Sequence, residues 1–331
     1  MDAVRSLPEI DELLASLRVV AIPTRTRFRG VSVREAAIFT GPQGATEFSP
    51  FPEYADDEAA AWLSAAIEYG WETAPVPLRD LVKVNATVPA VAPEQVPEIL
   101  SRFPGCRTVK VKVAERGQTL ADDEARVRAV RAHAGADALI RIDANGGWSL
   151  AEARIALERL APYSLDYAEQ PCASVADLAT LRSELRGTVR IAADESVRRA
   201  EDPLAVARAG AADLLIVKAQ PLGGIRRALA VLAEAGLPAV VSSALDTSVG
   251  ISMGARLAAA LPDPAAAGLG TVALLTGDIV TQPRVPVAGH IPSGRPTLNP
   301  AALDRHQASP ERESWWRERI ERCYALLSPD A

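Results

Sequence analysis

The sequence predicts an α/β protein, a closed parallel β/α barrel that carries a small α+β cap. Three observations predict this fold: β-branched apolar runs recur every 24 to 30 residues, helical patterns lie between them, and charged residues end five successive runs. A strand and a helix repeated at this interval are typical of parallel β/α architecture. The charged ends favour a closed barrel, because an open sheet would spread them along one edge instead of gathering them at one mouth.

The strand-helix repeat extends from residue 82 to residue 285. The expected strands are Val82–Pro89, Thr108–Val113, Ala138–Asn145, Leu165–Pro171, Arg190–Ser196, Leu214–Gln220 and Pro238–Ala244, with an eighth near Ala267–Leu275. Ser149 followed by Glu152 has the spacing of a capping box, which predicts a helix start. Gly236 stands where a helix is expected to end, because glycine enters the left-handed conformation cheaply. Residues 82–285 are therefore expected to form the barrel domain.

The two flanks of the repeat have different patterns. Val19–Ile22 and Val31–Phe39 alternate like antiparallel strands, and Asp56–Tyr69 has the period of an amphipathic helix. Residues 1–81 are therefore predicted to form the α+β cap. The tail, residues 286–331, is rich in proline and then helical over Pro310–Leu327, and we expect it to pack back on the cap.

Composition excludes several classes of function. The formal net charge of -6 argues against a nucleic-acid surface, which would need a basic face. No run approaches the roughly 18 apolar residues of a membrane span. The three cysteines form neither a paired framework nor a close-spaced metal motif. We therefore expect a cytoplasmic protein with reduced thiols, without membrane insertion or an obligate protein partner.

Charged side chains end the predicted barrel strands on one face. Charge inside a covered strand is costly unless it is paired or binds a metal, and residues two apart share a face. In chain order, the inward-facing polar residues are Lys110 and Lys112, then Arg141, Asp143 and Asn145, then Glu169, then Asp194, and then Lys218. A single Asp at a strand end is more often a cap or turn residue, and Glu195 fits that structural role. The joint arrangement is what indicates a site.

Asp143, Glu169 and Asp194 are the predicted metal ligands. Three converging carboxylates repel one another, and a divalent cation removes that cost. Oxygen-only coordination suits Mg²⁺, with Mn²⁺ as a workable substitute. The three histidines fall on a helix face or in the tail, and we expect structural or solvated roles for all of them (His133, His290 and His306).

The lysines predict the chemistry of the site. A metal beside a substrate carboxylate takes up the charge that develops when a neighbouring proton is removed. Lys112 is the predicted base, with its pKa lowered by charge repulsion from Lys110 and the metal. Lys218 is expected on the opposite side of the mouth, as a second acid/base or as a fixed cation.

This set of residues resembles the enolase superfamily, in its muconate-lactonizing branch. The resemblance covers nearly the whole chain and implies a modified TIM barrel, (β/α)7β, with an N-terminal capping domain. Four further segments are similar to those of a dehydratase in this branch. They are Phe28-Arg-Gly30, Glu169-Gln-Pro-Cys172, Lys218-Ala-Gln-Pro-Leu-Gly-Gly224 and Ser242-Ser-Ala-Leu-Asp-Thr-Ser-Val-Gly250.

The resemblance implies a metal-dependent lyase of menaquinone biosynthesis. The implied reaction is syn-dehydration of 2-succinyl-6-hydroxy-2,4-cyclohexadiene-1-carboxylate to 2-succinylbenzoate. Lys112 would remove the proton and return it to the departing hydroxyl, while Lys218 would stabilise the enediolate as a cation. The implied substrate-binding residues are Lys110, Asn145, Ser242 and Ser243, the last two holding the succinyl carboxylate. Arg141 is either a supporting charge behind Asp143 or an ordinary barrel salt bridge.

Three alternatives remain open. An N-acylamino acid or dipeptide racemase would use the same pair of opposed lysines. Dipeptide epimerases usually carry an Asp-x-Asp pair near strand eight, where this chain reads Gly268-Leu-Gly-Thr271, which counts against that substrate. A barrel aldolase would instead use Lys218 as a Schiff-base lysine. A non-catalytic barrel is disfavoured because all five charged strand ends are present.

Overall fold

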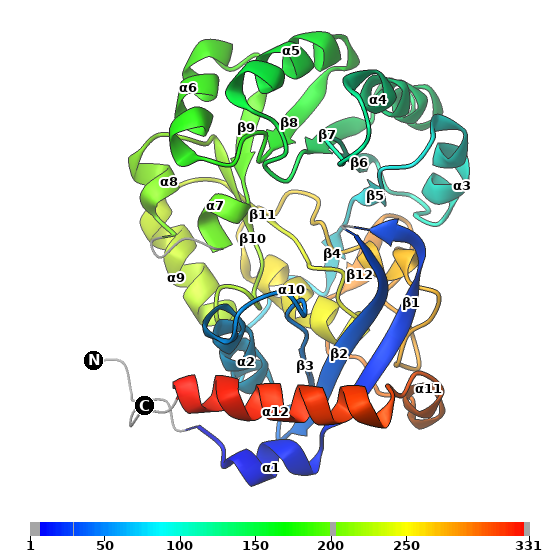
Figure 1. The fold of residues 1–331 in the computed structure, drawn as a ribbon, viewed down its shortest axis with the longest axis vertical. Coiled ribbons are helices and arrows are strands. Elements are labelled where there is room, and N and C mark those ends of the chain that lie inside the picture. The colour runs from blue at the N-terminus through cyan, green and yellow to red at the C-terminus, as the bar shows by residue number, and fades with distance from the viewer. Residues whose placement is uncertain (1–6, 29, 199–202, 328–331) are drawn as a thin grey trace.

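The computed structural model describes residues 7–28, 30–198 and 203–327. Its main feature is a curled sheet of seven parallel strands ringed by helices, with a smaller antiparallel sheet beside it (Figure 1). The structure is thus a modified TIM barrel with an N-terminal cap, as predicted. The loop Phe28-Arg-Gly30 is only partly covered, because Arg29 lies outside the described residues.

The barrel strands follow one another in chain order around the sheet. They are β5 (Ala86–Val88), β6 (Thr108–Lys112), β7 (Leu139–Asp143), β8 (Leu165–Glu169), β9 (Arg190–Ala193), β10 (Leu214–Val217) and β11 (Ala239–Val241). One face of these strands packs on the surrounding helices through residues such as Val111, Ile142 and Val217. The other face points into the barrel, where Tyr167 and Ile216 belong to a small apolar cluster. The alternation expected from residues two apart is therefore observed.

The ring is closed by a much shorter segment than the predicted eighth strand. Ala267 forms a parallel bridge with Val84, and Gly268 forms one with Ser242 at the end of β11. The prediction of a strand over Ala267–Leu275 is wrong beyond these two residues, because Thr271–Leu274 forms a 3-10 helix. Glycines at 268 and 270 weaken a strand here, since glycine contributes no side chain to pack and loses more conformational entropy.

The predicted first barrel strand, Val82–Pro89, is two strands. Its first part is β4 (Leu81–Lys83), which pairs antiparallel with β12 (His290–Pro292) from the tail. Only the second part, β5, joins the parallel sheet through its pairing with β6. The division of the chain at residues 81/82 and 285/286 stays a prediction.

Helices connect the barrel strands and cover their outer face. They are α3 (Val96–Ser101), α4 (Leu120–Ala134), α5 (Leu150–Leu160), α6 (Val175–Leu185), α7 (Glu195–Arg198), α8 (Ala205–Arg208), α9 (Ile225–Ala235) and α10 (Ser248–Ala260). The predicted capping box is present, because Ser149 accepts a hydrogen bond from the Glu152 amide and the Glu152 side chain accepts one from the Ser149 amide. Gly236 ends α9 with φ of 63°, as predicted. No helix among the described residues is long and apolar enough to cross a membrane.

The cap is built from an antiparallel sheet and three helices. Its strands are β1 (Arg18–Phe28), β2 (Val31–Gly41) and β3 (Gly44–Phe48), and the helices are α1 (Ile10–Ala15), α2 (Asp56–Trp71) and, from the tail, α12 (Pro310–Leu327). The short helix α11 (Pro300–Arg305) precedes α12. Figure 1 shows α12 crossing the cap close to α1 and α2. Trp316 and Cys323 of α12 are fully buried in the same apolar cluster as Trp62 of α2 and Phe48 of β3.

A buried carboxylate joins the cap to the barrel. Glu47 of β3 is completely buried and accepts hydrogen bonds from Thr247 Oγ1 at 2.6 Å and from the Gly250 amide at 2.9 Å, at the start of α10. Burial raises the pKa of Glu47 to about 7, and the nearby carboxylate of Asp246 adds to the effect. Arg34, also buried, lies 3.8 Å from Asp246 and offsets part of this charge.

This carboxylate predicts a pH-dependent stability. The pKa of Glu47 is higher in the folded chain than in the unfolded one, so the folded state binds more protons between about pH 4.5 and pH 7. The free energy of unfolding should therefore fall as pH rises through this window, with up to about 3 kcal/mol from Glu47. Glu47→Gln should remove that part of the slope. Urea unfolding of both proteins at pH 5 and pH 8 measures it, and equal slopes would contradict the assignment.

Candidate active site

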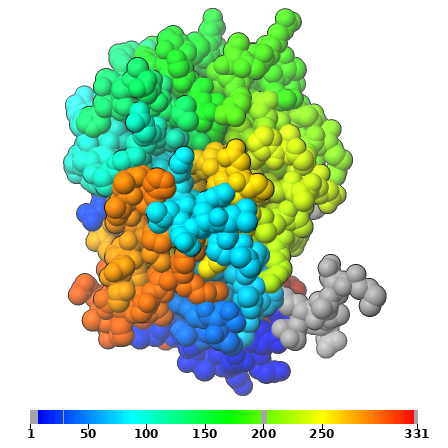
Figure 2. Space-filling model, turned by 180° about the vertical axis from the view of Figure 1, so that it is seen from behind, coloured from blue at the N-terminus to red at the C-terminus, as the bar shows by residue number. Residues whose placement is uncertain are grey.

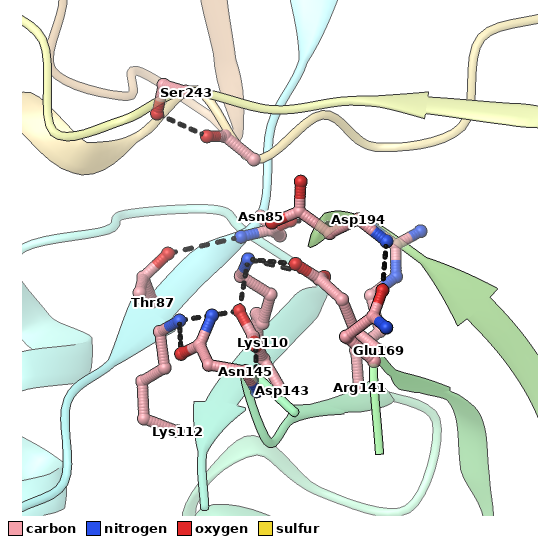
Figure 3. Close-up of polar contacts among 12 residues, drawn as sticks. Asn85, Thr87, Lys110, Lys112, Arg141, Asp143, Asn145, Glu169, Asp194 and Ser243 are labelled. Atoms are coloured by element: carbon pink, nitrogen blue, oxygen red, sulfur yellow. Dashed lines mark hydrogen bonds and ion pairs between the residues drawn. The ribbon is translucent and has the colours of Figure 1, made fainter. Parts of the chain in front are cut away.

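The parallel register brings the predicted site residues together. Lys112 of β6 pairs with Asp143 of β7, and Asp143 pairs with Glu169 of β8, so the three form one row across adjacent strands. Asp194 lies just beyond β9 and Lys218 just beyond β10, on the same inner face. Figure 3 shows the side chains of Lys112, Asp143, Glu169 and Asp194 close together at the carboxyl ends of the strands. Lys218 joins this group through its ion pair with Asp194.

The carboxylates and lysines of this row are paired with each other. Asp143 Oδ2 accepts hydrogen bonds from Lys112 Nζ at 2.6 Å and from Lys110 Nζ at 2.9 Å. Lys110 Nζ also donates to Glu169 Oε1 at 3.1 Å, and Lys218 Nζ forms an ion pair with Asp194. Each of the three carboxylate residues is 1 % exposed. Three carboxyl groups and three amino groups thus lie together in a buried place.

Burial and the neighbouring charges shift the pKa values of three residues in this row. For Asp143, burial would raise the pKa, but the charges of Lys110 and Lys112 hold it well below its usual range. For Lys110, burial would lower the pKa, but Asp143 and Glu169 hold it well above its usual range. Lys110 is therefore kept as an ammonium ion. Burial raises the pKa of Glu169 to about 8, and repulsion from Asp143 and Asp194 contributes.

The remaining predicted substrate-binding residues also lie around this row. Asn145 accepts from Lys112 Nζ at 2.6 Å and donates to Glu195 at 3.2 Å. Ser243 donates to the Gly268 carbonyl at 2.8 Å, so its hydroxyl contacts the segment that closes the barrel. These side chains border a small cavity of about 20 Å³, together with Ser242 and with Phe28 of the cap. The three histidines are not among the residues lining it.

Arg141 lies one layer deeper, away from the carboxylate row. Its Nε donates to Asp166 at 3.0 Å, and its Nη1 donates to the Ala266 carbonyl at 2.6 Å and to Asn85 at 3.3 Å. Of the two interpretations left open, this geometry matches the barrel salt bridge, because Arg141 forms an ion pair with Asp166 and its hydrogen bonds point to the other end of the barrel.

Gln170 supports the site and was given no role from the sequence. Its Oε1 accepts from the Asp194 amide at 2.9 Å and from the Ser196 amide at 3.2 Å. Its Nε2 donates to the Cys172 carbonyl at 2.9 Å, so the side chain ties the end of β8 to the end of β9. Its position directly after Glu169 could have indicated this role, because a buried amide at the end of a strand can form hydrogen bonds with the end of the neighbouring strand.

Gln170→Ala should therefore loosen Asp194 without removing a charge. We expect the affinity for a divalent metal to fall about 10- to 100-fold, as for other partners that orient a ligand. Calorimetric titration with Mg²⁺ measures the change. Gln43→Ala is the matched control, since Gln43 is an exposed glutamine of the cap. An affinity equal to that of the control would show that Gln170 does not orient the site.

Arg126 is a second supporting residue that the sequence did not reveal. It is 1 % exposed, and its guanidinium donates to the carbonyl of Lys112 and to that of Val91, both at 2.7 Å. It thus holds the end of β6, from which the Lys112 side chain extends. Nothing in a helical pattern distinguishes an arginine that turns inward from one that faces solvent.

The donor chemistry of the row fits a hard divalent cation. Three buried carboxyl side chains supply only oxygen ligands, which are the ligands that Mg²⁺ prefers. Among the residues that the structure describes, no three acidic, histidine or cysteine side chains are grouped as a finished metal site. The ammonium groups of the lysines lie between the carboxylates instead.

Comparisons with known proteins place the chain in a family. Residues 97–296 match the model described as enolase C-terminal domain-like, and residues 19–70 match the model described as enolase N-terminal domain-like. The chain therefore belongs to the enolase superfamily, as its motifs indicated. Enzymes of this superfamily use a divalent metal ion.

Two curated relatives of the chain share one enzyme name. The chain is 53 % identical over 323 residues to o-succinylbenzoate synthase of Mycolicibacterium smegmatis, covering 97 % of this chain and 99 % of that protein. It is 53 % identical over 325 residues to o-succinylbenzoate synthase of Mycobacterium tuberculosis, covering 98 % of each. Among solved structures, muconate lactonizing enzyme from Pseudomonas fluorescens matches with a TM-score of 0.74 at 20 % identity, over 88 % of this chain and 98 % of that one, which supports the fold.

Proposed function

We propose that the protein is an o-succinylbenzoate synthase, which dehydrates 2-succinyl-6-hydroxy-2,4-cyclohexadiene-1-carboxylate to 2-succinylbenzoate in menaquinone biosynthesis. The observation that carries the proposal is the near-full-length identity of 53 % to relatives of that name. The site supports it independently, because its carboxylates lie between Lys112 on one side and Lys218 on the other. We further propose that the enzyme works in the cytoplasm.

Asp143, Glu169 and Asp194 would hold the metal, and we propose Mg²⁺ with Mn²⁺ as a substitute. When bound, the divalent cation supplies positive charge that stabilises an enediolate and draws the charge of Asp143 away from the lysines. With Lys112 as the neutral base, the cation and the ammonium groups of Lys110 and Lys218 together outweigh the three carboxylates, so the site is positive. An anionic substrate suits such a site, as the proposed dicarboxylate would.

Lys112 is the proposed base and then the proposed acid. Its Nζ takes the proton from the carbon next to the substrate carboxylate, and the C–H electron pair enters the enediolate. The same ammonium then gives its proton to the hydroxyl on the same face as the C–O bond breaks, so water leaves and the ring becomes aromatic. One residue can serve both steps because the elimination is syn. Asn145 accepts from Lys112 Nζ at 2.6 Å and would hold it in place.

Lys218 and Lys110 are proposed to act as cations. Lys218 would stand over the opposite face of the enediolate, where its charge is attracted to the π system. Lys110, held as the ammonium ion by Asp143 and Glu169, would contact the substrate carboxylate. Ser242 and Ser243, which border the cavity at the end of β11, would bind the succinyl carboxylate.

The direct test is formation of 2-succinylbenzoate from the proposed substrate by the purified chain. We expect turnover with Mg²⁺ and none in excess EDTA, with activity restored by added Mg²⁺ or Mn²⁺. Turnover that persists in EDTA would remove the metal from the proposal. No product with any divalent metal would remove the proposed activity.

A racemase acting on N-acylamino acids is the second candidate. The observation that favours it is the presence of two lysines on opposite sides of the carboxylates, since racemisation needs a proton donor and an acceptor on opposite faces. Exchange of the α-proton of N-succinylamino acids with deuterated water, followed for each enantiomer, distinguishes the candidates. Exchange faster than dehydration would favour the racemase.

A further inference from the structure

A second cavity lies at the end of the barrel opposite to the active site. Its volume is about 640 Å³, within the range of pockets that bind small molecules. It shares no lining residue with the active-site cavity. Its strand residues Thr108, Arg141 and Tyr167 stand two positions before Lys110, Asp143 and Glu169 on the same inner faces, one layer further from the active-site mouth.

The segments that frame this cavity come from distant parts of the sequence. They are the stretch around Lys83, the loop over residues 263–266 and the tail over residues 288–290. Figure 2, seen from behind, shows the cyan, gold and orange parts of the chain that contain these segments lying side by side. The pairing of β4 with β12 and the bridge between Val84 and Ala267 hold them together.

The inner wall of the cavity is apolar. Tyr167, Leu214 and Val240 are buried there as part of the cluster that fills the barrel. Leu139 is also on the wall and is 50 % exposed, which is unusual for a leucine at the inner face of a barrel strand. An apolar wall of this kind favours a ligand with a carbon body, because covering it removes apolar surface from water.

The charges around the cavity are mainly positive. Four cationic side chains line the cavity, namely Lys83, Arg107, Arg141 and Arg190. Only two carboxylates line it, namely Asp166 and Asp263. This excess contrasts with the net charge of -6 of the whole chain. A concave surface with cationic walls concentrates anions. The ligand that fits is therefore an anion.

Arg141 is the group best placed to bind that anion. It is 2 % exposed, its guanidinium lies over the Tyr167 ring at 4.8 Å, and its Nε and Nη1 are bonded as described above. These contacts fix the plane of the guanidinium at the wall of the cavity, which Arg141 lines. Arg190 pairs with the same carboxylate, Asp166, so two guanidinium groups converge on one charge.

We propose that this cavity is a binding site for a small organic carboxylate with a flat apolar body, of the benzoate class. The carboxylate would bind between Arg141 and Arg190, and the ring would lie against Leu139 and Leu214. The site is separate from the proposed reaction and does not depend on it, since its residues take no part in the carboxylate row.

Calorimetric titration with sodium benzoate tests the proposal, with EDTA present so that no metal-dependent binding in the active site contributes. We expect a dissociation constant on the order of 1 mM for a ligand of this size. Arg190→Gln should weaken binding at least tenfold, because it removes one of the two guanidinium groups. Leu139→Glu should abolish binding, because it places a like charge on the wall at a position that solvent already reaches.

Three controls make the test specific. Arg154→Gln removes an arginine of similar exposure, paired with Glu184 on the outer helices, and should leave the affinity unchanged. Lys218→Ala should also leave it unchanged, and a loss there would place benzoate in the active site and overturn the proposal. Inorganic phosphate should bind at least tenfold more weakly than benzoate. Circular dichroism and the unfolding temperature show that each variant is folded.

The proposal is overturned by any of three results. The first is no heat of binding for wild type with benzoate up to about 50 mM, well above the expected constant. The second is equal affinity for wild type, Arg190→Gln and Leu139→Glu. The third is equal affinity for phosphate and benzoate, since that would leave no role for the apolar wall.

Discussion

Lys112→Ala is expected to lower the turnover of 2-succinylbenzoate formation by about 1,000-fold or more, because general acid–base catalysis by one residue contributes about that much and this lysine serves two steps. Lys112→Arg should be almost as inactive. Arginine keeps the positive charge but does not release its proton in proteins, so it cannot act as a base. Steady-state assay of both variants with saturating Mg²⁺ measures the loss.

Lys83→Ala is the matched control for these variants. The chain has only four lysines, and Lys83 is the one outside the site, exposed on β4. It should retain wild-type turnover. If Lys112→Ala or Lys112→Arg kept more than about a tenth of wild-type turnover, Lys112 would not be the base. Lys218→Arg should keep part of its turnover if Lys218 acts only as a cation, which separates the two lysines.

Asp194→Asn is expected to weaken binding of Mg²⁺ because it removes a charged ligand. The loss of affinity should exceed the loss of about 10- to 100-fold that follows from removing a residue that only orients a ligand. It also leaves Lys218, which is 5 % exposed, beside a neutral amide. Binding of Mn²⁺ followed by electron paramagnetic resonance measures the metal affinity without any need for turnover.

The control for this variant is Asp177→Asn. Asp177 lies in the first turn of α6, where it accepts a hydrogen bond from Ser174, and it is not part of the carboxylate row. Metal affinity should be that of wild type. An unchanged affinity in Asp194→Asn as well would exclude Asp194 as a ligand.

The sequence predicted the barrel because its strands obey a simple spacing rule. Lys112, Asp143 and Glu169 are all inward-facing and all end a strand, so the alternation of a strand and the closure of a barrel are enough to bring them together. Their shared burial follows from the same rule. The roles of these residues remain predictions until the variants are measured.

Features that depend on contacts between distant segments could not be predicted. The pairing of β4 with β12 joins residues about 200 positions apart and splits an apolar run that reads as one strand. The strand β3 is short and starts at Gly44, so its alternation is too brief to recognise. The closing segment at Ala267 and Gly268 is held by hydrogen bonds to both neighbours rather than by its own strand propensity.

The distribution of lysines in the sequence points to the site independently of the spacing of the strands. Three of the four lysines lie in the site, whereas apart from Lys83 every other Lys or Arg position of the chain is an arginine. Arginine serves ion pairs at least as well as lysine but cannot give up its proton, so lysine is needed where an amine must change its charge. The supporting residues Gln170 and Arg126 have no such signal, because an amide or a guanidinium is common on any surface.

The cavity of about 20 Å³ between Phe28 and the carboxylate row has room for one or two water molecules. Phe28 belongs to the cap and its ring lies 5.3 Å from Lys112 Nζ, so the cap itself completes the enclosure. The proposed substrate, with its six-membered ring, is larger than this space, so Phe28 has to move for it to bind. If that movement is slow, release of the product limits turnover even when the proton transfers are fast.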